Sequence, residues 1–216
     1  MFNICPGCGL YHVEKEIDPS GPFAVCPACG FRQSFVRLPM FVVTGASGAG
    51  KTTVCLQLPT ALPECVVLEA DVLWRPEFDQ PETQYRDFRD LWLRLVKNIH
   101  QSGRSVVLMG GAIPTQFESS PERRYLSEIH YLALVCDDHE LSQRLQKRPP
   151  WRGTHTAEVV QRMVDFNRWL REHAASTRPP MALLDTTDAS AEEMVSRVAA
   201  WVRAQITPRP GPSPRS

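Results

Sequence analysis

The residues with the most specific spacing in this 216-residue chain lie at positions 45–52 and read Gly-Ala-Ser-Gly-Ala-Gly-Lys-Thr. They match the pattern G-x-x-x-x-G-K-[ST], whose glycines let backbone N–H groups surround phosphate oxygens. An apolar run at 40–44 precedes the pattern and a helix-compatible segment follows it, which is the setting that the pattern requires. We predict that Lys51 reaches the β- and γ-phosphates of a nucleotide and that the Thr52 hydroxyl binds Mg²⁺. The predicted nucleotide-binding residues here are Gly45, Ala46, Ser47, Gly48, Ala49, Gly50, Lys51, Thr52 and Thr53, the last as a helix residue rather than a ligand.

Four cysteines form the second pattern, in the segments Cys5-Pro-Gly-Cys8 and Cys26-Pro-Ala-Cys29. Two thiolates three positions apart can bind one metal ion, and two such pairs complete a tetrahedral zinc site. A closed site of four sulfurs is structural rather than catalytic. We therefore predict a zinc ribbon at residues 1–38 that holds structural Zn²⁺, with His12 as a surface residue.

The charges of the chain bear on its partners. The predicted ribbon has equal numbers of basic and acidic side chains, which are Lys15, Arg32 and Arg37 against Glu14, Glu16 and Asp18. The whole chain has 24 of each sign and a net charge of zero. Nucleic-acid binding depends on a basic surface, so a nucleic-acid partner is not expected. We expect the ribbon to stabilise the fold or to contact a protein.

The composition is that of a globular protein, with 43% hydrophobic and 22% charged residues. No apolar run approaches the roughly 18–20 residues that span a bilayer, so we expect no membrane segment. The first residues lack the pattern of a secretory signal, which favours a cytoplasmic protein with reduced cysteines. The last ten residues, 207–216, contain four prolines and are predicted to be a disordered tail.

Residues 39–206 alternate short apolar runs with longer amphipathic segments, which is typical of βα units around a parallel sheet. Strands are predicted at 40–44, 65–68, 106–109, 131–135 and 182–184, each covered on both faces. Helices are predicted at 51–58, 84–101, 139–146, 157–174 and 191–205, with Pro59 and Pro63 ending the first. The fold class is therefore α/β: a P-loop NTPase fold with a five-stranded parallel sheet flanked by helices.

On these motifs, residues 39–206 resemble the P-loop nucleoside monophosphate and small-molecule kinases. This family includes adenylate, shikimate and gluconate kinases and chloramphenicol phosphotransferase. The resemblance implies transfer of the γ-phosphate of ATP, with Mg²⁺, to a nucleoside, a nucleotide or another small hydroxylated acceptor.

Two carboxylates follow the second predicted strand, in Leu68-Glu69-Ala70-Asp71. Ligands of open α/β sheets bind at this edge, and the family places an acidic residue here near the acceptor. The resemblance implies that Asp71 activates the acceptor hydroxyl, with Glu69 as the alternative. An ordinary helix-capping role for Asp71 remains open.

Arginines follow the fourth predicted strand at 144, 148 and 152. They resemble the helix of these kinases that runs into a lid, whose arginines neutralise the transferring phosphoryl group. The resemblance implies that Arg148 and Arg152 bind phosphate and that Arg144 lies beside adenine. It also implies that Thr187, after the last strand, touches the base. Solvated helix charges and a helix cap are the ordinary alternatives.

The family binds its acceptor between the second and third strands. Aromatic and arginine side chains there could stack on a ring and bind a phosphate. The acceptor-binding candidates are Trp74, Arg75, Arg86 and Arg89. In the same segment Leu91, Leu95 and Ile99 recur at helical spacing and predict a core-facing stripe, with Phe88 and Trp92 on or near it.

The sequence departs from the family pattern at two strand ends. The third strand runs into Gly110-Gly111 with no acidic residue, whereas the fourth runs into Asp137-Asp138. A hydrophobic run that ends in aspartate suits an ATPase whose carboxylate holds Mg²⁺. A P-loop ATPase or nucleotide switch, with a ribbon that engages a protein or RNA partner, is therefore the alternative prediction.

Overall fold

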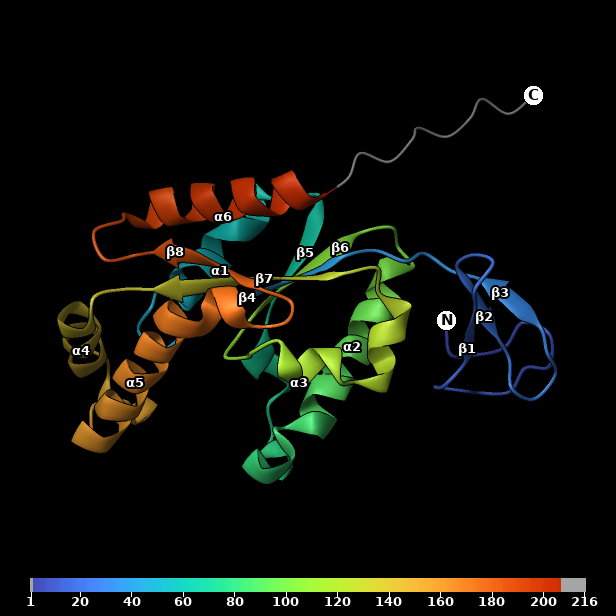
Figure 1. Cartoon of the computed structure of the whole chain (residues 1–216), viewed down its shortest axis with the longest axis horizontal. Helices are drawn as coiled ribbons and strands as arrows, with labels where there is room; N and C mark the ends of the chain where they lie inside the picture. The colour runs from blue at the N-terminus through green and yellow to red at the C-terminus, as the bar shows by residue number, and fades with distance from the viewer. Residues whose placement is uncertain (1, 207–216) are drawn as a thin grey trace.

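Five parallel strands form the central sheet of the protein, seen here in a computed structural model that describes residues 2–206 (Figure 1). They are β4 (Met40–Gly45), β5 (Cys65–Glu69), β6 (Ser105–Met109), β7 (Ile129–Val135) and β8 (Met181–Asp185), in the order β5-β6-β4-β7-β8. Every neighbouring pair is parallel. The predicted five-stranded parallel sheet is thus confirmed. The predicted tail at 207–216 lies outside the described residues.

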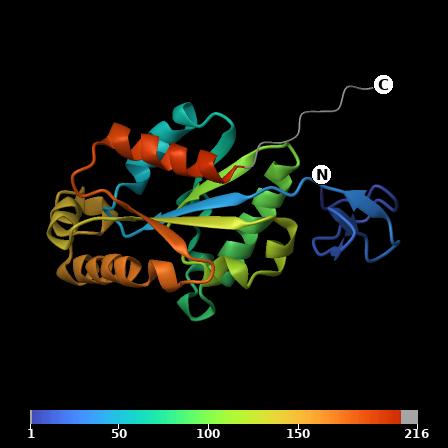
Figure 2. The same cartoon turned by 45° about the horizontal axis from the view of Figure 1, so that its top comes forward.

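Helices cover both faces of this sheet (Figure 2). They are α1 (Lys51–Ala61), α2 (Arg86–His100), α3 (Thr115–Glu118), α4 (Asp138–Gln146), α5 (Ala157–His173) and α6 (Ala191–Gln205). The short 3-10 helices are η1 (Ala70–Leu73), η2 (Pro76–Phe78), η3 (Pro81–Thr83), η4 (Pro121–Tyr125), η5 (Pro150–Arg152) and η6 (Ala174–Ser176). Within residues 2–206, no helix has the length and apolar character needed to cross a bilayer.

Two hydrophobic cores lie on opposite faces of the sheet because alternate strand residues point to opposite sides. On β4, Met40 and Val42 face the core of α2 and α5, whereas Phe41 and Val43 face the core of α1 and α6. Each core is continuous along its face of the sheet. The two faces are therefore separate packing units.

Three local predictions differ from the structure. Helix α1 continues through Pro59 to Ala61, since Pro59 lies in the last turn, where it removes a single hydrogen bond. The outer strand β8 is not covered on both faces, and Leu183 is 46% exposed. On α2, Leu95 is 36% exposed, while Trp92 and Val96 are buried with no exposed surface. Phe88, Trp92 and Ile99 pack in the core as predicted, whereas Leu95 lies outside it. A spacing of four residues alone does not separate neighbouring faces of one helix.

The N-terminal ribbon, residues 2–38, lies at one end of the molecule next to α2 (Figure 1). Its three short strands are β1 (Glu16–Asp18), β2 (Phe23–Val25) and β3 (Arg32–Ser34), which pair antiparallel in that order. Both cysteine pairs lie in turns outside these strands. The division of the chain at residues 38 and 39 stays a prediction.

Candidate functional site

The glycine-rich loop connects the central strand β4 to α1, as the motif requires. Gly45 has a φ of 150°, and a Cβ atom there would lie 2.5 Å from the carbonyl oxygen of Leu134 on β7. A side chain is therefore excluded where the chain leaves the sheet. The loop lines a cavity of about 430 Å³, here named the phosphate-loop cavity. Its lining includes Gly45, Ala46, Ser47, Gly48, Gly50, Lys51, Thr52 and Thr53, with Ala49 buried behind the loop.

Lys51 begins α1, and its ammonium group turns back over the loop. Its Nζ donates to the carbonyl oxygens of Gly45, at 2.7 Å, and Ala46, at 2.9 Å. Burial, together with the nearby charge of Arg148, lowers the pKa of Lys51 to about 8 against the opposing effect of Asp71 and Glu69. The ammonium is therefore held by the loop at the position where phosphate oxygens would approach.

Two carboxylates face Lys51 across the phosphate-loop cavity. Glu69 ends β5 and Asp71 follows it in η1, and both line the cavity. The Thr52 hydroxyl donates to Glu69 Oε1 at 3.5 Å. A hydroxyl and a carboxylate side by side are oxygen ligands of the kind that Mg²⁺ takes, so Thr52 and Glu69 fit a shared magnesium ion.

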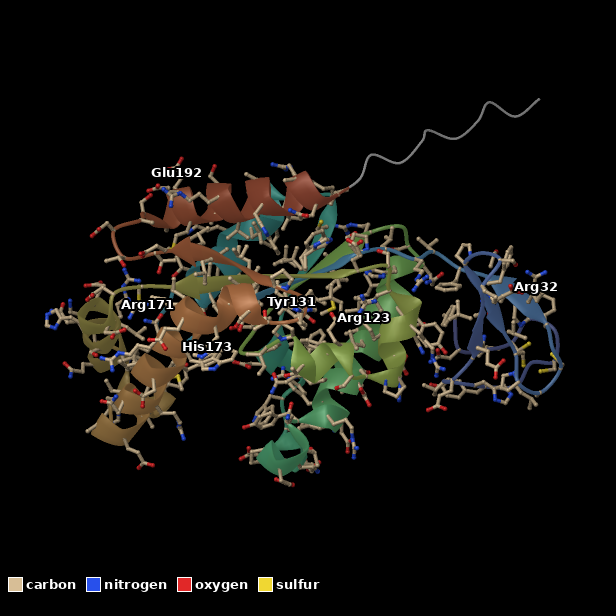
Figure 3. The ribbon with its side chains drawn as sticks, viewed as in Figure 1. Arg32, Arg123, Tyr131, Arg171, His173 and Glu192 are labelled. Carbon is tan, nitrogen blue, oxygen red and sulfur yellow. The ribbon has the colours of Figure 1, made fainter. Side chains whose placement is uncertain are left out.

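The aspartates after β7 are engaged elsewhere. Asp137 caps α4 and accepts from the backbone N–H of His139 at 2.8 Å. Asp138 accepts from Asn167 Nδ2 at 3.1 Å and from Arg171 at 2.7 Å, both on α5. Figure 3 labels Arg171. Among the described residues, neither aspartate lines the phosphate-loop cavity. The Asp138 carboxylate therefore joins α4 to α5, and Glu69, not either aspartate, is the carboxylate beside Thr52.

Arg144 and Thr187 come together at one rim of the site. The guanidinium of Arg144 pairs with Glu140 at 2.8 Å and donates to the carbonyl oxygens of Thr186, at 3.0 Å, and Thr187, at 2.8 Å. Arg144 lines the phosphate-loop cavity, whereas Thr187 lines a separate hollow of about 240 Å³ with Asp185. The structure thus joins the two residues by hydrogen bonds but does not place both in one cavity.

Arg148 and Arg152 line the same cavity from beyond α4. Across residues 2–206, neither guanidinium has a carboxylate within ion-pair distance, and Arg152 lies 4.9 Å from the ring centre of Trp151. Burial lowers the pKa of Arg148, and the charge of Arg152 lowers it further. Like charges gathered without a carboxylate between them form a site for a polyanion.

A second cavity of about 530 Å³ adjoins the first and is here named the aromatic cavity. It is lined by Ala70, Asp71, Trp74, Asp79, Tyr85, Phe88, Arg89 and Gly111. Asp71 and Gly111 line both cavities. The preceding Gly110 lets β6 end against η1, because a Cβ atom there would lie 2.6 Å from the Cβ of Ala70. The two cavities therefore meet at Asp71.

The acceptor candidates divide in two. Trp74 and Arg89 line the aromatic cavity, whereas Arg75 lines neither cavity and Arg86 lines a shallow hollow beside Asp90. Five other residues line the aromatic cavity and were not predicted as site residues, which are Ala70, Asp79, Tyr85, Phe88 and Gly111. Tyr85 has a φ of 60°, a left-handed conformation at the N-cap of α2 that no motif announces.

Arg89 is a cation surrounded by aromatic rings. It is 5% exposed, and its Nη2 donates to the Gly111 carbonyl oxygen at 2.7 Å. Its guanidinium lies 5.4 to 5.8 Å from the ring centres of Phe88, Phe117 and Tyr85. Its Nε is buried without a hydrogen-bond partner, and within residues 2–206 it has no ion pair. Burial lowers the pKa of Arg89 to about 10, so it remains charged at neutral pH.

The four ribbon cysteines form the one cluster of metal-ligand side chains found among the described residues. Their sulfur atoms all lie within 4.8 Å of one another, with Cys5 to Cys29 at 3.6 Å and Cys8 to Cys26 at 3.9 Å. A tetrahedron with Zn–S bonds of about 2.3 Å has sulfur–sulfur edges of about 3.8 Å. The cluster therefore has the ligand set and the dimensions of a structural zinc site, and His12 is not part of it.

Comparison with known proteins agrees with this architecture. A match to the AAA domain family covers residues 42–161 of the 216. A search among curated proteins found no similar sequence.

Solved structures share the fold. A sugar kinase from Janibacter sp. HTCC2649 superposes with a TM-score of 0.57 at 18% identity, over 79% of this chain and 96% of that chain. Shikimate kinase from Acinetobacter baumannii, in complex with shikimate, gives 0.51 at 21% identity, over 79% and 96%. A gluconokinase from Sinorhizobium meliloti 1021 gives 0.50 at 19% identity, over 80% and 99%. The chain therefore belongs to the AAA domain family and has the fold of the small P-loop kinases.

Proposed function

We propose that this protein transfers the γ-phosphoryl group of ATP to a hydroxyl group of a small acceptor. The observation that carries the proposal is the position of Asp71, which lines both the phosphate-loop cavity and the aromatic cavity. A carboxylate at such a junction faces the donor and the acceptor together. Binding both substrates in adjoining cavities replaces a bimolecular encounter with a positioned reaction.

The charged side chains of the phosphate-loop cavity then have separate roles in the transfer. Asp71 accepts the proton of the acceptor hydroxyl while the oxygen of that hydroxyl bonds to the γ-phosphorus. The bond from the γ-phosphorus to the bridging β-phosphate oxygen breaks, and ADP leaves. Lys51 and the arginines Arg148 and Arg152 neutralise the charge on the transferring group. Thr52 and Glu69 would hold Mg²⁺, which supplies further neutralisation when bound. Arg144, fixed by Glu140, forms the wall on the adenine side with Thr187 behind it.

Arg89 defines the chemical class of the acceptor. A buried charge without a partner is costly, and a guanidinium binds a carboxylate or phosphate through two parallel hydrogen bonds. The aromatic side chains of Trp74, Tyr85 and Phe88 provide flat walls beside it. We infer an acceptor that is small, hydroxylated and anionic, with a ring or an apolar face.

The first experiment is phosphorylation of a panel of hydroxy acids, sugar acids, nucleosides and nucleotides with γ-labelled ATP. Removing a general base costs about 10²- to 10⁴-fold in rate, so Asp71→Asn should lose acceptor phosphorylation by that factor and still bind nucleotide. Asp79→Asn is the matched control, because Asp79 lines the aromatic cavity but not the phosphate-loop cavity. Hydrolysis of ATP that needs no acceptor and survives Asp71→Asn would contradict the proposal.

A nucleotide switch is the second candidate, and one observation favours it. The ribbon exposes apolar side chains, with Leu10 at 54% and Tyr11 at 60% exposure, as a protein-binding surface does. A switch predicts slow hydrolysis that a macromolecular partner stimulates, and it tolerates Asp71→Asn. The panel assay therefore distinguishes the two candidates.

A further inference from the structure

The ribbon is joined to the α/β domain along one helix, α2. Lys97 of α2 has no exposed surface, and its Nζ donates to the Val13 carbonyl oxygen at 3.1 Å. The same ammonium pairs with Glu122 of η4 at 2.6 Å. One turn further, the Gln101 side chain accepts from the Val36 N–H at 2.9 Å and donates to the Val36 carbonyl at 3.2 Å. Polar contacts therefore tie the C-terminal half of α2 and its C-cap residue to the ribbon at Val13 and Val36.

Tyr125 forms a second connection, centred on one hydroxyl group. Its oxygen accepts from the Lys15 N–H at 2.6 Å and donates to the Lys15 carbonyl at 2.8 Å. Phe2 and Phe35 pack around the Tyr125 ring, with centres 5.3 and 6.2 Å away. Both phenylalanines belong to the hydrophobic core that contains Trp92 of α2. The ribbon thus completes the core on the α2 face of the sheet and takes no part in the core of α1 and α6.

Lys15 connects this junction to the interior of the ribbon. It is 2% exposed, and its Nζ donates to the Phe2 carbonyl at 2.7 Å and to Gln33 at 2.8 Å. This one buried residue therefore links Tyr125 of η4 to Phe2 and to Gln33 of β3.

The opposite half of α2 forms the aromatic cavity. Phe88 and Arg89 line the cavity from the first turn of α2, and Tyr85 lines it from the N-cap position. Arg89 and Lys97 are two turns apart on the same buried face, about 12 Å along the axis. A shift of the ribbon end of this rigid helix therefore moves the side chains that line the cavity.

We propose that the metal-loaded ribbon braces the aromatic cavity through α2, with Lys97 as the positioning residue that transmits the constraint. Metal loss unfolds the cysteine turns, releases Lys15 from Tyr125 and withdraws Phe2 and Phe35 from the α2 core. The phosphate-loop cavity keeps its geometry because α1 packs in the other core. The effect on acceptor turnover rests on the proposed kinase function, whereas the effect on α2 does not.

The test compares the full-length protein with and without zinc, after removal by a chelator and dialysis into Mg²⁺. Metal content is measured first, and amide hydrogen exchange is then followed in α1 and α2. We expect one zinc per chain and exchange in α2 that is at least tenfold faster without it, with α1 unchanged within twofold. The KM for the acceptor should rise about tenfold, while the Kd of a non-hydrolysable ATP analogue stays within twofold.

Two variants separate bracing from general destabilisation. Lys97→Met removes the ammonium and keeps the stem. Gln101→Ala removes the side-chain contacts to Val36 and to the Lys97 carbonyl oxygen, and it serves if Lys97→Met does not fold. Either variant should speed exchange in α2 and raise the acceptor KM with zinc bound. Arg203→Ala is the control, since it breaks the ion pair with Glu64 on the opposite face.

Three results would overturn the proposal. They are a protein that binds no zinc, exchange in α2 that does not respond to zinc, and an equal rise in α1 and α2. If α2 responds but no acceptor is phosphorylated, the brace stands and the kinase proposal fails.

Discussion

The two cavities that meet at Asp71 are built in different ways. The phosphate-loop cavity is formed largely by the backbone of one loop at the centre of the sheet, with cations added at its rim. The aromatic cavity is formed by side chains beyond the edge strand β5. A site made of backbone N–H groups binds phosphate whatever the side chains of the loop are. The shape and charge of a site made of side chains change with each substitution. Substitutions in the aromatic cavity can therefore alter acceptor recognition without altering the recognition of the phosphate donor.

The largest expected effect tests the donor side. Lys51→Met should lower the rate of phosphoryl transfer by about 10²- to 10³-fold, as loss of one preorganised donor to a transition state does. Acceptor binding, measured by calorimetry, should not change. Lys147→Met is the control, because Lys147 is exposed at the C-cap of α4 and lines neither cavity. Loss of acceptor binding in Lys51→Met would show that the cavities are not independent.

The reciprocal change is Arg89→Leu. A hydrogen bond to a charged group contributes about 1.5 to 3 kcal/mol, so the acceptor KM should rise about ten- to a hundredfold with the nucleotide Kd unchanged. The free energy of unfolding should stay level or increase, since an apolar side chain replaces a buried charge without a partner. Kinetics and thermal unfolding measure both quantities.

Arg86→Leu is the control for this prediction, because Arg86 lies on the same helix but outside the aromatic cavity. A fall in stability in Arg89→Leu without a change in KM would assign Arg89 a purely structural role.

The affinities of the two cavities for their ligands should depend on pH in different ways. Lys51, whose pKa is about 8, is charged below that pH and loses its proton above it. Affinity for an ATP analogue should therefore fall above pH 8, by up to about tenfold per pH unit. Affinity for the acceptor should hold to about pH 10, where Arg89 begins to lose its charge. Lys51→Arg should abolish the inflection near pH 8, and its persistence in that variant would reassign it to another group.

The smallest expected effect concerns Trp74, whose ring lies 5.1 Å from that of Phe88 at a right angle. Such aromatic contacts contribute about 0.5 to 1.5 kcal/mol, so Trp74→Ala should raise the acceptor KM about two- to tenfold. Trp74→Phe should retain most of the affinity. Val72→Ala provides the comparison, because Val72 is 71% exposed in η1, the 3-10 helix that ends just before Trp74. An equal effect of Val72→Ala would mean that the segment moves as a unit.

The glycine-rich loop could be predicted from the sequence because its residues are contiguous and its glycines are required by one backbone conformation. The parallel sheet followed from the alternation of apolar and amphipathic segments. The acceptor side was only partly predicted, because Asp79 and Tyr85 reach the aromatic cavity from the irregular segment between β5 and α2. Phe88 was interpreted as a core residue, and it contributes to the core and lines the cavity as well.

The aromatic cavity is encoded almost entirely by one stretch of the sequence. Apart from Gly111, every residue that lines it comes from a single stretch of the chain, residues 70–89. On the proposed function, insertion, deletion or exchange of this stretch would change acceptor recognition and leave the phosphate-loop cavity intact. Relatives that diverge in substrate should accordingly vary in length and composition between β5 and α2. For the same reason, a segment transplanted between relatives is the natural unit for redesigning specificity in this protein.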